Sequence, residues 1–328
     1  MTRADSNAPR PRIAVLGGTG FIGRHLLPRL VKDHWEVTVI TRSRARHRDL
    51  LVMPTVRLVE GDVHDARVLE QTLPGHTAVV NLVAILNEKG DDGRGFQHVH
   101  VDLTRKLIAA CRGAGVGRLA QITALKADAH NGPSYYLRSK GVAEGLLRDA
   151  HSEDLAVTLY QPSVVFGPGD SFINRFADLL RLPAPFMPLP KADARFAPVY
   201  VGDVVEAIAR SLRDPATYGN TYQLCGPRVY TLREVIRLIS DTLEIDKPVL
   251  ALPDGVARLQ AKVMDFIPGK PFSSDNFRSL SVPSVCDSDG LGRLGLEPAS
   301  MESIVPGYLR DATRSPLDQY RDERPDAR

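Results

Sequence analysis

The sequence predicts a doubly wound α/β fold, a parallel sheet with helices on both faces, followed by a smaller and less regular C-terminal lobe. Short, nearly continuous apolar runs alternate with amphipathic stretches through the first half of the chain. A glycine cluster follows the first run, and the alternation weakens after about residue 167, where prolines accumulate. Parallel strands are buried on both faces and need helical crossovers, so these observations favour the doubly wound arrangement.

The expected elements alternate along the chain as strand and helix. The apolar runs have the length of strands, and the amphipathic stretches repeat their apolar residues at helical spacing. Strands are expected at Ile13–Leu16, Glu36–Thr41, Val56–Glu60, Ala78–Ala84, Arg118–Thr123 and Ala156–Gln161. Helices are expected at Phe21–Lys32, Ala66–Thr72, Phe96–Ala114 and Ser134–Ala150.

The same patterns indicate how the chain divides into domains. Residues 1–10 are polar and are expected to be a flexible N-terminus. Residues 11–166 should form the sheet domain, with later segments at about 196–226 returning to it. Residues 167–313 should form mainly the C-terminal lobe, and the polar residues 314–328 a frayed tail.

The composition excludes several classes of function. The 328 residues are 43% hydrophobic, and a formal net charge of +3 gives no field that would favour nucleic acid. There is no run of about 18 apolar residues to span a membrane, and the polar N-terminus lacks the apolar core of a secretory signal. The cysteines, Cys111, Cys225 and Cys286, are far apart and lack metal-ligand spacing. They predict no metal site and a reducing compartment, the cytoplasm.

Three glycines after the first strand predict a nucleotide site. Gly17, Gly20 and Gly23 are spaced G-x-x-G-x-x-G between a strand and a helix. Gly17 allows a tight turn, Gly20 lets a pyrophosphate approach the N–H groups of the helix N-terminus, and Gly23 allows close packing. The alternative is a glycine-rich turn without a ligand. The loop residues expected at the cofactor are Gly17, Thr19, Gly20, Phe21, Ile22 and Gly23.

The end of the second strand indicates which dinucleotide is preferred. An acidic residue there binds the ribose 2′-hydroxyl, whereas an arginine accommodates a 2′-phosphate. The strand ends in T-R-S-R-A-R-H-R, so that Arg42 follows it directly. A guanidinium matches a phosphate because it donates two parallel hydrogen bonds. NADP(H) is therefore favoured, with NAD(H) as the alternative, and the arginines of 44–48 alone would be an ordinary solvated face.

Two further segments fit the same nucleotide pocket. Asp62 and Val63 follow the third strand, where an acid and an apolar residue would flank the adenine; Asp62 has the alternative role of a helix cap. The fourth strand ends in V-N-L-V-A, where backbone near the ribose is expected. The candidate residues there are Leu82, Val83 and Ala84.

A possible catalytic group is formed by Tyr136 and Lys140. They are spaced i, i+4 in Y-L-R-S-K and so share one face of a helix. A lysine ammonium there lowers the pKa of a phenol and makes Tyr136 a usable proton donor or acceptor. Tyr135 faces elsewhere, and Thr123, at the end of the fifth strand, offers a hydroxyl to orient a carbonyl. The alternative is a surface pair on a helix.

These motifs together resemble a known family. The sequence is similar to an extended, atypical short-chain dehydrogenase/reductase and, more narrowly, to the NADPH-binding accessory subunit of respiratory complex I and its bacterial relatives. The resemblance spans about residues 12–240 and rests on five blocks: G-G-T-G-F-I-G-R, Y-L-R-S-K, Q-P-S-V-V-F-G-P-G-D-S-F-I-N-R-F, A-P-V-Y-V-G-D-V and Y-Q-L-C-G-P. The departure is Thr123, where members usually carry serine; threonine keeps the hydroxyl.

The resemblance implies roles for several residues. It matches Thr123, Tyr136 and Lys140 to the catalytic positions and places Pro162 and Val165 beside the nicotinamide. It makes Tyr200–Val204 a structural segment joining the lobes, and Asp203 is interpreted as a helix cap.

Two functions follow. The first is an NADP(H)-dependent oxidoreductase, or a sugar-nucleotide-type epimerase or dehydratase, using the Thr-Tyr-Lys trio. The second is a catalytically silent nucleotide-binding structural or assembly protein, at the inner face of a membrane or within a respiratory complex. The C-terminal lobe is rich in Pro, Leu and Phe, which favours an apolar small molecule or a protein partner over a sugar nucleotide. Asn174, Arg175 and Arg195 are the candidates for substrate contact, with surface or inter-lobe ion pairs as the alternative.

Residues 253–268, P-D-G-V-A-R-L-Q-A-K-V-M-D-F-I-P, predict an amphipathic helix with Asp254 as its N-cap and Pro268 as its stop. Its charged side chains cluster opposite an apolar stripe. The stripe consists of Val256, Leu259, Val263, Phe266 and Ile267. Either the stripe closes the core of the C-terminal lobe, or it docks on a membrane surface or a partner subunit.

Overall fold

A computed structural model describes residues 10–267 and 272–311. The tail expected at 314–328, nearly all of the N-terminal segment 1–10, and Pro268 lie outside the described residues. The chain forms two compact units: Met1–Gln161 with Val204–Gln223, and Pro162–Asp203 with Leu224–Arg328.

A seven-stranded sheet is the centre of the first unit. Its order is β11-β6-β5-β4-β1-β2-β3, and β1 pairs in parallel with both β2 and β4. The chain therefore reverses its direction of strand addition beside β1, where doubly wound folds bind ligands. The strands are β1 Arg12–Leu16, β2 Glu36–Thr41, β3 Val56–Glu60, β4 Ala78–Asn81, β5 Arg118–Ile122, β6 Ala156–Pro162 and β11 Thr221–Leu224.

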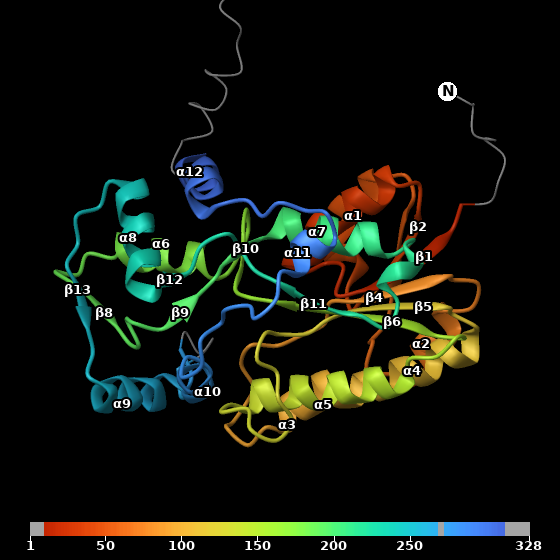
Figure 1. Cartoon of the computed structure of the whole chain (residues 1–328), viewed down its shortest axis with the longest axis horizontal. Coiled ribbons are helices and arrows are strands. Elements are labelled where there is room, and N and C mark those ends of the chain that lie inside the picture. The colour runs from red at the N-terminus through yellow and green to blue at the C-terminus, as the bar shows by residue number, and fades with distance from the viewer. Residues whose placement is uncertain (1–9, 268–271, 312–328) are drawn as a thin grey trace, which may run out of the picture. The chain divides into compact units, whose positions relative to one another are not determined.

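Helices cover both faces of this sheet, which confirms the predicted fold class. Figure 1 shows α1 and α7 on one side and α2, α4 and α5 on the other. The core between sheet and helices is mostly leucine and valine, and each fully buried leucine contributes about 1.5–3 kcal/mol. The helices are α1 Phe21–Lys32, α2 Ala66–Thr72, α3 Arg94–Phe96, α4 Leu103–Ala114, α5 Tyr135–Ala150 and α7 Val201–Ser211.

Some local structure differs from the expectation. The helix expected at Phe96–Ala114 is divided by a π-helical turn at Gln97–Asp102, and the carboxylate of Glu88 accepts the N–H groups of Gly93 and Gly95 just before it. Two short 3₁₀ turns within Arg44–Val52, separated by a kink at His47, were not expected, because the segment buries only Leu50 and so lacks apolar periodicity. The fourth strand ends at Asn81, whose side chain binds the N–H of Val83.

The returning segment of the first unit is held by buried polar groups. The Arg118 guanidinium donates to the carbonyl of Ser211 (3.1 Å) and to the Thr158 hydroxyl (2.7 Å). In the middle of α7, the partly exposed Glu206 forms an ion pair with Arg29 (2.7 Å), which lowers the pKa of that carboxyl to about 2. The segment is thus tied to β5, β6 and α1.

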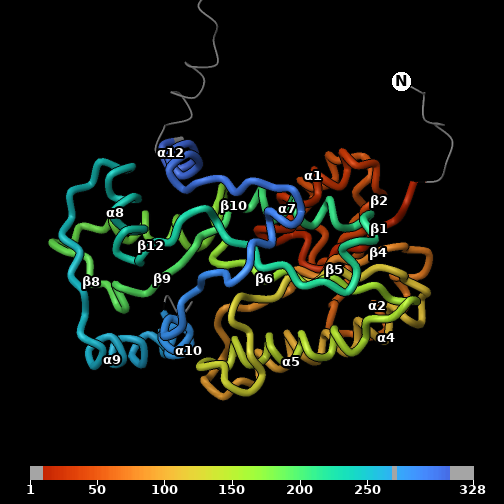
Figure 2. The backbone as a smooth tube through the Cα atoms, viewed as in Figure 1, coloured from red at the N-terminus to blue at the C-terminus, as the bar shows by residue number. Residues whose placement is uncertain are grey.

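The described residues of the second unit form three two-stranded sheets in place of one large sheet. Its core collects apolar side chains from short strands and from α6, α8 and α12. Figure 2 follows the chain from α8 through β13 into α9 along one edge. The strands are β7 Val165–Phe166, β8 Met187–Leu189, β9 Arg195–Phe196, β10 Val199–Tyr200, β12 Tyr230–Thr231 and β13 Val249–Ala251. The helices are α6 Ile173–Arg181, α8 Leu232–Leu243, α9 Asp254–Met264, α10 Ser274–Ser279, α11 Gly290–Arg293 and α12 Met301–Asp311.

Asp170 organises the P-G-D-S-F-I-N-R-F block. It is buried, and its carboxylate accepts the N–H groups of Phe172 (2.8 Å) and Ile173 (2.6 Å) at the start of α6, and the Tyr308 hydroxyl (3.0 Å). Burial and this carboxylate raise the pKa of the Tyr308 phenol. The block that is most specific to the resemblance therefore has a structural role in the second unit.

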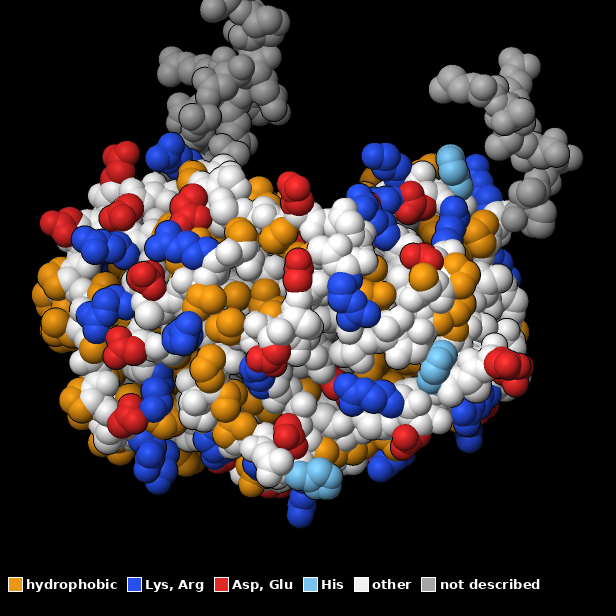
Figure 3. All heavy atoms as spheres, in the orientation of Figure 1, with side chains coloured by type: hydrophobic (Ala, Val, Ile, Leu, Met, Phe, Trp, Pro, Cys, Tyr) orange, Lys and Arg blue, Asp and Glu red, His pale blue; other side chains and the backbone are white. Residues whose placement is uncertain are grey.

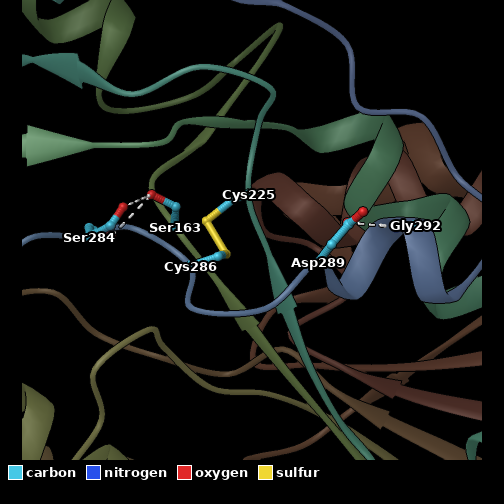
Figure 4. Close-up of a disulfide and its surroundings, with 6 residues drawn as sticks. All are labelled: Ser163, Cys225, Ser284, Cys286, Asp289 and Gly292. Carbon is cyan, nitrogen blue, oxygen red and sulfur yellow. Dashed lines mark hydrogen bonds between the residues drawn. A yellow bond between two sulfur atoms is a disulfide. The ribbon is translucent and has the colours of Figure 1, made fainter.

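A disulfide corrects the expectation of reduced cysteines. Cys225 and Cys286 are bonded, and the Ser163 hydroxyl donates to the Ser284 carbonyl (2.7 Å) close by (Figure 4). The two cysteines are 61 residues apart, so only the fold brings them together. Cys111 is a buried free thiol, and its burial raises its pKa.

Two expected helix caps are also wrong. Asp254 is the first residue of α9, follows the N-cap Pro253, and pairs with Lys191 (2.8 Å). Asp203 lies in the first turn of α7 and accepts the N–H of Ala299 (2.8 Å), while partial burial raises its pKa. In both cases the carboxylate interacts with a residue distant in the sequence and does not cap the N–H groups of its own helix.

The interpretation of α9 as a core-closing helix is wrong. Its buried residues are Ala257 and Ala261, which pack against Phe277. The apolar stripe from Val256 to Ile267 is exposed instead, and Phe266 is 90% exposed. The small side chains, and not the large ones, fasten this helix to the second unit.

Candidate nucleotide and proton-transfer site

The glycine loop has the geometry of a close backbone approach. Gly17 has φ +75°, and a Cβ there would lie 3.1 Å from the backbone of Leu82 and Val83. A Cβ on Gly23 would lie 2.5 Å from the Gly18 Cα. Gly17 and Gly23 therefore hold the loop, β4 and α1 together in a way that a larger residue would prevent.

The N-terminus of α1 offers free donors to an anion. The N-cap is Gly20, which has no side chain to satisfy the first N–H groups, and Gly20 itself is exposed. The first N–H groups of a helix lack intrahelical acceptors and carry the positive end of its dipole. Thr19, Phe21 and Ile22 are partly exposed in the same turn. These features suit a diphosphate.

Two arginines lie near the loop and differ in their partners. Arg42 directly follows β2 and is exposed. Arg24, in the first turn of α1, donates to the Thr19 carbonyl (3.2 Å) and pairs with Asp49, which lowers the pKa of that carboxyl. Arg42 is therefore an exposed cation at the end of β2, whereas Arg24 is engaged by an acid.

The flanking segments have local structural partners. Asp62 accepts the N–H of His64 (3.0 Å), but α2 is capped by Asp65, so the interpretation of Asp62 as the helix cap is wrong. Val63 is partly buried against the core. Leu82 and Val83 lie against Gly17, and Ala84 is exposed beyond them. Backbone of this segment thus borders the glycine loop.

The structure brings Tyr136 and Lys140 together on α5. The Lys140 Nζ lies 6.0 Å from the centre of the Tyr136 ring. Tyr135 instead packs beneath the Arg138 guanidinium, 4.7 Å from its ring centre. Of the two adjacent tyrosines, Tyr136 is the one beside the lysine.

Lys140 is a buried cation. It is 2% exposed, and its Nζ donates to the Ile122 carbonyl (3.3 Å). Burial lowers its pKa to about 8, although Glu144, one turn on, opposes that effect. Glu144 is itself buried and accepts from the Gln161 amide (2.9 Å) and from Arg148 (2.8 Å). With a pKa of about 8, Lys140 is mostly protonated at pH 7 and loses its proton as the pH rises past 8.

Thr123 is directed differently from the expectation. Its N–H and its hydroxyl both donate to the carbonyl of Tyr160 on β6, at 2.8 Å and 3.2 Å. The side chain is 3% exposed. Its hydroxyl keeps lone pairs but its proton is engaged by backbone, so its part in any reaction is weaker than the sequence suggested.

His100 completes the surroundings of Tyr136 and was missed from the sequence. It belongs to the π-helical turn, and such turns often occur at functional sites. The Ile85 N–H donates to His100 Nε2 (3.3 Å), so the ring proton is on Nδ1, which donates to the Ser139 hydroxyl (2.8 Å). The ring lies 5.5 Å from that of Tyr136. Burial and the nearby Lys140 charge hold the pKa of His100 well below its usual value.

The remaining candidates belong to the second unit. Pro162 is the buried last residue of β6, and Val165 is partly buried in β7. Asn174 donates to the backbone of Asp170 (3.0 Å), and Arg195 is exposed in β9. No group of three or more metal-binding side chains occurs among the residues that the structure describes.

The fold and this glycine loop define the class of nucleotide-binding α/β proteins, and comparisons with known proteins give the family. The model of the NAD dependent epimerase/dehydratase family matches residues 13–225. The chain belongs to this family, which bears out the resemblance to extended and atypical short-chain dehydrogenases.

Individual relatives differ in activity. The chain is 27% identical over 299 residues to the mouse mitochondrial NADH dehydrogenase [ubiquinone] 1 alpha subcomplex subunit 9, covering 88% of this chain and 77% of that one. It is 28% identical over 249 residues to a ceramide reductase of Caulobacter vibrioides, covering 74% of each. A dTDP-glucose 4,6-dehydratase of Streptomyces venezuelae, solved with NAD, has a TM-score of 0.70 at 24% identity and covers 91% of this chain and 96% of that one. That last likeness shows the fold alone.

Proposed function

We propose that the protein is an NADP(H)-dependent oxidoreductase that acts on an apolar carbonyl compound or the corresponding alcohol. The observation that carries this proposal is the buried Lys140 beside the ring of Tyr136. A buried ammonium at that place stabilises a phenolate and thereby makes Tyr136 an effective proton donor and acceptor.

The protein's own groups would supply binding and proton transfer. The cofactor, when bound, supplies or accepts the hydride. Tyr136 gives its phenolic proton to the carbonyl oxygen, so that the substrate gains one hydride and one proton and becomes the alcohol. Lys140 stabilises the phenolate that remains. His100, neutral and hydrogen-bonded through Ser139 to the carbonyl of Tyr136, keeps that first turn of α5 in place.

The preference for NADP(H) over NAD(H) rests on Arg42. It is exposed at the end of β2, and no acidic residue occupies that strand end to bind a 2′-hydroxyl. The diphosphate would lie on the N–H groups at the start of α1, beyond Gly20.

A second candidate function is a catalytically silent, nucleotide-holding subunit or assembly protein. The direction of the Thr123 hydroxyl, toward the Tyr160 carbonyl, favours it, because the third catalytic hydroxyl is then not presented to a substrate. The likeness to a mitochondrial NADH dehydrogenase subunit also favours it and would place the protein in a respiratory complex, peripheral to a membrane.

The two candidates are separated by assaying NADPH oxidation with a panel of short-chain and long-chain aldehydes and ketones. Where turnover occurs, we expect Tyr136→Phe to reduce kcat by roughly 10²–10⁴-fold, the usual value of a general acid. Tyr135→Phe, the matched control, should keep the wild-type rate. NADPH should bind both variants nearly as well as the wild type. Full activity in Tyr136→Phe would reject the proton-transfer role, and NADPH binding without turnover on the whole panel would favour the silent subunit.

A further inference from the structure

One edge of the second unit exposes an unusual number of large apolar side chains. Twelve such side chains are exposed in the described part of the chain, and nine of them belong to this unit. Five are consecutive members of the stripe on and just after α9, with exposures of 51% for Val256, 63% for Leu259, 57% for Val263, 90% for Phe266 and 43% for Ile267. Single exposed apolar residues are ordinary, but a cluster of this kind marks a binding surface.

The stripe is not required by the unit's own core. α9 is fastened through Ala257 and Ala261, which are fully buried against Phe277. On this helix the small apolar side chains are buried and the large ones are exposed. Most of its apolar surface is therefore available to a partner outside the unit. The stripe therefore calls for a second surface to cover it.

The strands next to α9 extend the apolar edge. β13 precedes the helix and pairs in parallel with β8. Leu250 on β13 is 48% exposed, and Phe186, just before β8, is 43% exposed in the run L-P-A-P-F. Figure 3 shows apolar side chains along this edge of the second unit, with both basic and acidic side chains among them.

The charged side chains of the α9 segment are two exposed cations and two acids, one of which is paired with a lysine from outside the segment. Arg258 and Lys262 are exposed on α9. Of the two acids of the same segment, Asp254 forms an ion pair with Lys191 (2.8 Å), whereas Asp265 accepts the N–H of Ser274 (3.1 Å) and keeps its negative charge. Lys247, just before β13, adds another cation, whose Nζ donates to the Leu182 carbonyl. An apolar stripe with a terminal phenylalanine and flanking cations is the pattern of a helix that lies in an anionic membrane interface.

We propose that this docking edge, formed by Phe186, Leu250, Val256, Leu259, Val263, Phe266 and Ile267, binds the surface of an anionic phospholipid bilayer. Insertion of the apolar side chains supplies the binding, and Arg258, Lys262 and Lys247 select negatively charged headgroups. In the described part of the chain, no helix is long and apolar enough to cross a bilayer. The docking edge explains how such a chain reaches a membrane, and it does so whether or not the nucleotide site turns over.

The test is co-sedimentation of the full chain with large unilamellar vesicles of phosphatidylcholine, with and without phosphatidylglycerol. The wild type should bind the anionic vesicles at least roughly tenfold more strongly than the neutral ones and lose binding as salt rises. Leu259→Asp with Phe266→Asp should reduce binding at least roughly tenfold, because both charges enter the apolar region. The matched control is Val52→Asp in the first unit, where Val52 is 83% exposed, and it should bind as the wild type does.

Stability measurements and a charge variant keep the test decisive. The melting temperature of the double variant should stay within about 2 °C of the wild type, since exposed substitutions rarely change stability. Lys262→Glu should weaken binding to anionic vesicles and leave the melting temperature unchanged. The proposal is overturned if the wild type binds neither vesicle, if the double variant binds as the wild type does, or if it melts far lower. It is also overturned if the stripe instead forms a dimer in sedimentation velocity that the double variant abolishes, without vesicle binding.

Discussion

Helices α5 and α9 have similar apolar periodicity in the sequence and use it in opposite ways. α5 turns its large residues inward, so that Leu137 and Leu147 are buried with the cation Lys140 among them. α9 turns Ala257 and Ala261 inward and leaves Leu259 and Phe266 in the open. Apolar periodicity in the sequence therefore predicts a helix and its apolar stripe. Whether that stripe is buried depends on the apolar surface against which the helix packs.

The difference follows from what each helix packs on. α5 lies against the seven-stranded sheet of the first unit, which offers a broad apolar face. α9 follows a two-stranded sheet, and its Ala257 and Ala261 pack with Phe277 in a small cluster that the partly buried Leu252 and Phe272 border. A cluster of that size has room to bury the two alanines of α9. The larger apolar side chains of the helix stay exposed and are available to another partner.

The largest effect expected from this comparison is on stability. Leu147→Asp places an unpaired charge at a fully buried position of α5 and should lower the free energy of unfolding by several kcal/mol or prevent folding. Leu259→Asp, the matched change on α9, should stay within about 0.5 kcal/mol of the wild type. Urea denaturation of both variants measures this. Equal destabilisation would mean that the α9 stripe is part of the core.

The sequence predicted most of the first unit for clear physical reasons. The bounds of α1, α2, β2 and β3 are those expected, because each is a sharp apolar pattern between polar turns. The π-helical turn at Gln97–Asp102 was missed because the apolar spacing of Phe96–Ala114 is that of one continuous helix. The disulfide was missed because Cys225 and Cys286 are brought together only by the fold. The sequence pointed to His100 only by its place among the apolar residues of the expected helix, in F-Q-H-V-H-V.

The site was predictable in part for a related reason. The glycine loop and the pair Tyr136 and Lys140 are local patterns, and spacing alone places their members together. The direction of the Thr123 hydroxyl depends on where the neighbouring strand β6 places the Tyr160 carbonyl, which local spacing does not contain. The same holds for Asp62 and Asp203, whose expected caps were replaced by other hydrogen bonds.

A smaller difference between α5 and α9 is expected in how their lysines affect the pH dependence of stability. Lys140 on α5 has its pKa lowered to about 8 by burial, against an unfolded value of about 10.4. Between these values the unfolded chain holds a proton on this lysine that the native protein does not, so the contribution of Lys140 to the free energy of unfolding should rise with pH and be flat below about 8. The rise is on the order of 3 kcal/mol. Lys140→Met should abolish it.

The control for that measurement is on the other helix. Lys262→Met removes an exposed lysine of α9 and should leave the pH dependence of stability as in the wild type. Identical slopes for the wild type and Lys140→Met between pH 8 and 10 would contradict a buried, partly neutralised lysine.

Titration calorimetry with NADPH and NADH tests whether the first unit binds NADP(H) through its glycine loop and Arg42. NADPH should bind more tightly, and Arg42→Ala should weaken NADPH binding roughly 10–100-fold, since a charge-assisted hydrogen bond contributes about 1.5–3 kcal/mol. NADH binding should hardly change, and Arg46→Ala, the matched control in the neighbouring basic segment, should leave both unchanged. Equal affinities for NADPH and NADH in the wild type, or an Arg42→Ala variant that still prefers NADPH, would contradict the account.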